Sequence, residues 1–176
     1  MLKVNKINQY KSKKILSLDK AKKLIRLIRK LGLKSKGFFI LGYPGETKEQ
    51  MQMTVDFAAD SGLDWALFFI ATPIPGSGIE KICKEKGYLV NDNLDYVRQF
   101  YRCSIKTPEF GPDYLAKLRE KANLEINFKN NTNIRLGNYD RAIEDIGEVV
   151  KLYPKLSFAK YYLNQAKKLK MFCEKT

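Results

Sequence analysis

Two short apolar runs, separated by a segment long enough for one helix, constrain the fold of this chain more than any other feature. The first run, GFFILGY, occupies residues 37–43, and the second, WALFFIA, occupies residues 65–71. Each run ends in a turn rich in glycine and proline. Between them, Thr47 and Gln50 match the S/T-x-x-E/Q capping box, which predicts a helix from there to about residue 61. Strand, helix and strand in this length predict a βαβ unit with parallel strands.

A further helix is predicted before this unit, over residues 17–31. Its apolar residues recur every three or four positions, and Gly32 follows as a stop signal. The resulting order αβαβ is typical of an α/β barrel or a doubly wound sheet. The apolar runs do not alternate with polar residues, which favours strands that are buried on both faces.

The residue types present exclude several kinds of chemistry. The chain has no histidine, and its cysteines, Cys83, Cys103 and Cys173, form no CxxC pair. We therefore predict no catalytic residue and no metal ligand in this chain. Sparse cysteines favour a reducing, cytoplasmic location. No apolar run approaches the roughly 18 residues of a membrane span, so no membrane partner is expected.

The net charge of +14 leaves a choice of partners open. A basic surface is compatible with RNA binding, but lysines on the solvent faces of helices explain the same charge. One hypothesis for the whole chain is therefore a non-catalytic, basic adaptor module that binds RNA or a protein.

The βαβ segment resembles a known family. GFFILGYPGET, the helix after it and FFIATPIPGSGIEKICKEKGYL together resemble the later part of a radical S-adenosylmethionine (SAM) domain. The resemblance is closest to the subgroup with a cobalamin-binding domain ahead of the radical barrel. It extends from VNK, near the start of the chain, to about residue 90.

The resemblance implies an α/β fold: a partial (β/α) barrel that contains its last two parallel strands with flanking helices. Residues 1–90 would form this barrel remnant, residues 91–111 a connecting segment and residues 112–176 a helical tail. The tail resembles a single tetratricopeptide repeat (TPR), with matches at the positions Gly137, Tyr139, Ala142, Val149 and Pro154. One repeat cannot bury its own faces, so the tail is expected to pack on the barrel remnant, as a cap or as a docking surface.

The family uses SAM and a four-iron four-sulfur cluster, and its subgroup adds cobalamin. The cluster-binding CxxxCxxC motif is absent from this sequence. The resemblance therefore implies the C-terminal portion of a radical SAM oxidoreductase or methyltransferase, inactive alone, with no cofactor expected to bind tightly to it. Its partner would be the missing N-terminal part of the radical SAM domain. Otherwise the two open edges of so small a sheet would self-associate, or the helical tail would cover them.

The resemblance also suggests binding residues for SAM. In the family, a GxIxGxxE-like segment at the end of the fifth strand lies near the adenine. Ile40 and Gly42 keep the I-x-G spacing, but Phe38 replaces the first glycine, and the acid falls one position late, on Glu46. The candidate cofactor-binding residues are Ile40, Gly42, Tyr43, Gly45, Glu46 and, at the end of the next strand, Thr72.

The glycine after the first strand decides between two interpretations of this turn. Without a Cβ at Gly42, the backbone can approach a flat ring closely, so Gly42→Val is expected to harm SAM binding more than folding. The alternative is that the segment is only an economical strand-to-helix turn.

Overall fold

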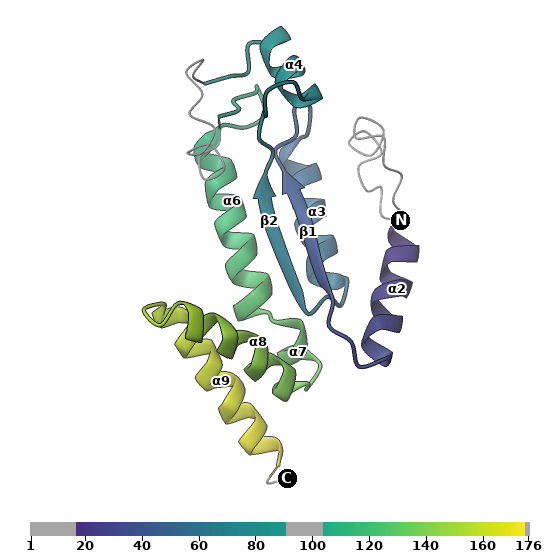
Figure 1. Cartoon of the computed structure of the whole chain (residues 1–176), viewed down its shortest axis with the longest axis vertical. Coiled ribbons are helices and arrows are strands. Elements are labelled where there is room, and N and C mark those ends of the chain that lie inside the picture. The colour runs from purple at the N-terminus through teal and green to yellow at the C-terminus, as the bar shows by residue number, and fades with distance from the viewer. Residues whose placement is uncertain (1–16, 91–103, 175–176) are drawn as a thin grey trace.

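The computed structural model describes residues 17–90 and 104–174 (Figure 1). Predictions that concern VNK, Cys103 or the segment 91–103 lie outside the described residues. Three helices flank two strands in the first part: α2 (Leu18–Lys30), β1 (Lys36–Leu41), α3 (Lys48–Asp60), β2 (Trp65–Ile70) and α4 (Gly78–Glu85). The second part is helical: α6 (Pro112–Leu124), a π-helical turn η1 (Glu125–Lys129), α7 (Thr132–Arg135), α8 (Tyr139–Leu152) and α9 (Ser157–Cys173).

The predicted parallel βαβ unit is present. β1 and β2 pair in parallel from Lys36 opposite Trp65 to Leu41 opposite Ile70. The capping box that starts α3 is formed in both directions: Thr47 Oγ1 accepts from the Gln50 amide, and Gln50 Oε1 accepts from the Thr47 amide. Local sequence signals therefore fix where this helix begins.

The strands are not buried on both faces, which corrects the prediction from their apolar runs. One face packs on α3 and α6, and there Phe39 and Phe68 stack with ring centroids 5.1 Å apart. On the other face Phe38, Ile40 and Phe69 are 69%, 60% and 48% exposed. Phe38 and Phe69 stack there at 6.1 Å, without a covering layer among the described residues. Buried and exposed side chains alternate along each strand because the strand is pleated, and the uniformly apolar sequence does not reveal this alternation.

The outer edge of β2 is covered by the first helix of the tail, which is one of the two alternatives expected for the open edges of the sheet. The side-chain amide of Asn127 donates to the Ala66 carbonyl at 2.6 Å and accepts from the Ala66 amide at 2.8 Å. Asn123 makes the same pair of bonds with Phe68, at 3.3 and 3.1 Å. The two asparagines stand one helical turn apart and replace a neighbouring strand.

Removing both asparagines should expose this edge. In the variant Asn123→Leu/Asn127→Leu, four backbone groups of β2 lose their partners, each at a cost of about 1–3 kcal/mol where it stays dry. We expect a lower urea midpoint and a scattering mass that rises with protein concentration. Asn130→Leu, at an exposed position just beyond η1, is the matched control. A double variant that remains monomeric and as stable as the parent would show that the edge needs no cover.

The described part of the tail ends in a helical hairpin. α8 and α9 pack along one another (Figure 1), and Ile146 and Ala159 form a second core with Phe128 of η1. Trp65 meets Phe128 edge-on, with ring centroids 5.5 Å apart, so this core reaches the start of β2. The tail divides near Pro154, since α8 ends at Leu152 and α9 begins at Ser157. The resemblance to a TPR stays a prediction.

Candidate functional site

The turn after β1 is closed by the carboxylate of Glu46. This side chain is buried, and its Oε2 accepts from the amides of Gly42 at 2.8 Å and Tyr43 at 3.0 Å. The chain reverses through left-handed glycine conformations, with φ of 80° at Gly42 and 91° at Gly45. The structure therefore assigns this oxygen of Glu46 to the backbone of the turn.

The turn after β2 repeats the arrangement. Glu80 Oε2 accepts from the amide of Gly76 at 2.7 Å, and Gly76 has φ of 76°. The bond from Lys84, at 2.8 Å, and then the Gly76 amide lower the pKa of Glu80. Both turns thus carry a Gly-x-x-x-Glu spacing in which the acid closes the loop. This repeated spacing is a signal in the sequence that Glu46 closes a turn, and it is independent of the family motif.

The structure accounts for Gly42 by packing. A Cβ built at this position would lie 2.5 Å from Cδ1 of Leu115 in α6. The direction in which a side chain at residue 42 would point is therefore filled by a leucine of the protein itself. The substitution Gly42→Val is therefore expected to disturb the contact between the turn and α6. Whether it harms SAM binding more than folding stays a prediction.

An apolar cleft of about 370 Å³ lies on the uncovered sheet face, at the carboxyl ends of the two strands. It brings together two of the candidate residues, Ile40 and Thr72. The remaining lining residues are mostly apolar: Phe38, Phe69, Ile70, Ala71, Ile74, Ile79 and Arg119. The other candidates, Gly42, Tyr43, Gly45 and Glu46, form the neighbouring turn and do not line this cleft. Carboxyl ends of parallel strands are where α/β proteins place ligands.

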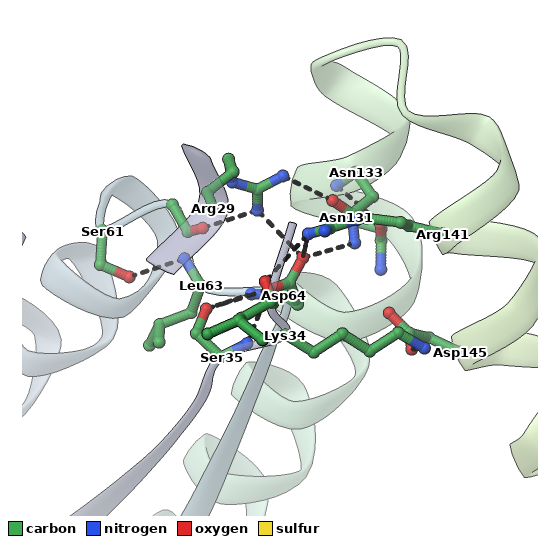
Figure 2. Close-up of polar contacts among 12 residues, drawn as sticks. Arg29, Lys34, Ser35, Ser61, Leu63, Asp64, Asn131, Asn133, Arg141 and Asp145 are labelled. Atoms are coloured by element: carbon green, nitrogen blue, oxygen red, sulfur yellow. Dashed lines mark hydrogen bonds and ion pairs between the residues drawn. The ribbon is translucent and has the colours of Figure 1, made fainter. Parts of the chain in front are cut away.

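A polar cluster at the opposite, amino ends of the strands is the second candidate (Figure 2). Its centre is Asp64, which is buried and accepts from the amide of Ser35 at 2.8 Å. Its other oxygen accepts from Asn133 at 3.1 Å and pairs with Arg29 at 3.2 Å and Arg141 at 3.4 Å.

These contacts come from four parts of the chain. Arg29 lies in the last turn of α2 and Ser35 precedes β1. Asn133 and Arg141 belong to α7 and α8. Burial opposes the ionisation of Asp64, but the hydrogen bonds from Ser35 and Asn133 and the charge of Arg29 outweigh it and lower the pKa of the carboxyl. A neighbouring cavity of about 160 Å³ is lined by two of these residues, Ser35 and Asp64, together with residues of β2 and α8. We assign this cluster a structural role, because it connects the helical tail to the amino ends of the strands. In α/β barrels, residues at this end contribute to stability, whereas catalytic residues lie at the carboxyl ends.

Metal binding and membrane insertion find no support in the described residues. Within residues 17–90 and 104–174, no three His, Cys, Asp or Glu side chains gather as metal ligands would. The helices described there are too short or too polar to cross a bilayer.

Comparison with known proteins places the chain beside methyl- and methylthiotransferases. It is 34% identical over 122 residues to the cytidylyl-2-hydroxyethylphosphonate methyltransferase of Streptomyces wedmorensis, a match that covers 65% of this chain and 23% of the relative. It is 31% identical over 103 residues to an uncharacterised methyltransferase of Pyrococcus horikoshii, over 56% of this chain and 21% of the relative. The ribosomal protein uS12 methylthiotransferase of Actinobacillus pleuropneumoniae is 39% identical over 61 residues, 35% of this chain and 13% of the relative.

These similarities support a relationship to radical SAM-type enzymes. The chain spans less than a quarter of the length of the curated relatives it matches. No model of a protein family matches it.

Proposed function

We propose that this chain is the C-terminal portion of a radical SAM domain of the oxidoreductase or methyltransferase type. It contributes the adenine side of the SAM pocket and part of the substrate cleft. The observation that carries the proposal is the apolar cleft at the carboxyl ends of two parallel strands, on a sheet face that no described segment covers. A face of this kind faces the interior when a barrel is closed.

The unpaired edge of β1 is a second feature that supports a missing partner segment. The amide of Trp65 donates to the carbonyl of Ser35, and the amide of Ala71 donates to the carbonyl of Leu41. The backbone groups of odd-numbered residues along β1 therefore face β2. The backbone groups of Lys36, Phe38 and Ile40 therefore point the other way. No described segment pairs with them. Nearby, α2 exposes an apolar stripe of leucines, Leu24, Leu27 and Leu31.

The remainder of a radical SAM domain fits both features. A further parallel strand would continue the sheet from β1, and its flanking helix would cover the leucine stripe of α2. That remainder would hold the iron–sulfur cluster, because this chain lacks the CxxxCxxC motif. In the cobalamin-dependent subgroup it would also bring the cobalamin. Self-association through the same edge is the competing use of this surface.

The names of the relatives do not converge on one substrate. They mention a cytidylyl phosphonate, a ribosomal protein and a modified adenosine of tRNA. The adaptor hypothesis remains a prediction, but two cations of α2 are engaged within the protein: Lys22 with the ring of Phe57, at 5.5 Å, and Arg29 with Asp64.

Adenine recognition can be tested on the full chain by nuclear magnetic resonance. We expect adenosine to shift the Ile40 methyl and the Tyr43 and Thr72 amides. Inosine, which differs where the adenine amino group would donate, should bind roughly two- to ten-fold more weakly, as the loss of one hydrogen bond predicts. Shifts confined to other parts of the chain, or equal affinity for the two nucleosides, would rule out an adenine subsite here.

A further inference from the structure

The cleft on the uncovered sheet face contains one charged side chain, and its position is set by the way α6 docks on β2. Asn127 binds the edge of β2 at Ala66, and Asn123 binds it at Phe68. Four residues of helix rise about 6 Å, and two residues of strand span about 6.6 Å, so helix and strand stay in step. The next position in this series pairs residue 119 with residue 70. There the amide is replaced by an arginine, which lines the cleft beside Ile70.

The guanidinium of Arg119 has no polar partner in the part of the protein that the structure describes. Within residues 17–90 and 104–174, it forms no ion pair and no hydrogen bond. Other arginines of the helical part are engaged: Arg135 donates to the Ala59 carbonyl at 2.7 Å, and Arg141 to Asp64 at 3.4 Å. Arg119 is therefore available to a ligand in the cleft.

The other walls of the cleft offer a ligand apolar contact. The described residues that line it include no acid, and Thr72, the one among them with a hydroxyl group, donates to the Ile70 carbonyl at 3.2 Å. Among these described residues, an anion that entered the cleft would meet one cation and no repelling charge. A guanidinium beside apolar walls binds carboxylates and phosphates with directed hydrogen bonds.

We propose that Arg119 makes this cleft selective for a ligand with an anionic group, a carboxylate, phosphate or phosphonate, on an apolar body. The apolar body packs on Phe38, Ile40 and Phe69, and the anionic group pairs with Arg119 at the side of β2. The identification of this ligand with the substrate of the parent enzyme rests on the proposed function, whereas the binding chemistry rests on the cleft alone.

Three probes that share one apolar body test the proposal on the full chain: 4-phenylbutyrate, 4-phenylbutylphosphonate and 4-phenylbutanol. The isoleucine methyls of the cleft, Ile40, Ile70, Ile74 and Ile79, report binding, and Ile25 and Ile146 report distant effects. We expect the anions to bind the parent chain roughly three- to ten-fold more tightly than the alcohol, as one partly solvated charged contact predicts. The ratio between the two anions distinguishes a carboxylate site from a phosphonate site.

Variants separate the charge from the apolar walls. Arg119→Met should bind all three probes with the affinity of the alcohol, and Arg119→Lys should retain part of the preference for anions. Lys117→Met, at an exposed position of the same helix, removes the same charge and should change nothing. Equal binding of the three probes to the unmutated chain, or an undiminished preference for the anions in Arg119→Met, would overturn the proposal. If the anion preference is present but adenosine does not bind, the proposed function fails and this inference stands.

Discussion

Replacing Asp64 with asparagine is expected to lower the free energy of unfolding by about 3–5 kcal/mol, the usual cost of leaving buried charges without their partner. The carboxylate is the common partner of two guanidinium groups, Arg29 and Arg141. Asparagine keeps the size of the side chain but turns an accepting oxygen into a donor that faces these cations. Urea denaturation at pH 7 measures the difference.

The pH dependence of this difference follows from the lowered pKa of Asp64. A carboxyl whose pKa is lower in the folded chain than in the unfolded chain stabilises the fold above its unfolded pKa of about 3.9. That contribution is lost as the pH falls through the folded pKa. The stability difference between the parent and Asp64→Asn should therefore be largest near neutrality and shrink below about pH 4.

Asp145→Asn is the matched control, because Asp145 is a second half-buried acid near the same cluster. Burial comes first among the causes that raise the pKa of Asp145, and the charges of Asp64 and Glu144 add to it against the pull of Lys34. Its contribution to stability is present below the unfolded pKa and declines as the pH rises through the folded one. Lys34 keeps Glu144 as a partner at 2.9 Å. We expect a change within about 1 kcal/mol at pH 7. If both asparagine variants cost the same, Asp64 is not the centre of the cluster.

Gly42→Ala should destabilise the fold by about 2–5 kcal/mol, the sum of two separate effects. A residue with a Cβ in the left-handed conformation costs roughly 1–2 kcal/mol, and an overpacked contact costs roughly 1–3 kcal/mol. The second term arises from Leu115, whose Cδ1 lies 2.5 Å from the position of the new methyl group.

Gly76→Ala isolates the strain from the clash. Gly76 has nearly the same φ, its amide also donates to a glutamate, and a Cβ there would meet no atom within 4 Å. It should cost only the strain term. Gly42→Ala combined with Leu115→Ala should cost less than the two single changes add up to, because the clash is then removed. Equal melting temperatures for the two glycine variants would show that α6 does not press on the turn.

The sequence by itself determined the local architecture. Ser17, Thr47 and Ser77 cap the helices that begin at Leu18, Lys48 and Gly78. The apolar runs became the two strands, and glycines with positive φ stand in the turns after them. These features could be read from the chain because a cap, a turn or a strand depends on residues that are close neighbours in sequence.

Only the tertiary structure decided what these elements do together. Leu115 lies 73 positions from Gly42, and nothing near Gly42 in the sequence indicates that a leucine packs against it. Asn123 and Asn127 look like ordinary polar residues of a helix until the edge of β2 lies beside them, and Arg119 lines the cleft only because that docking sets its register. Of the candidate residues, Ile40 and Thr72 line the cleft while Glu46 closes a turn, because strand pairing and helix docking decide which side chains remain free. Such contacts join segments far apart in the chain, so their partners are fixed by packing rather than by local sequence.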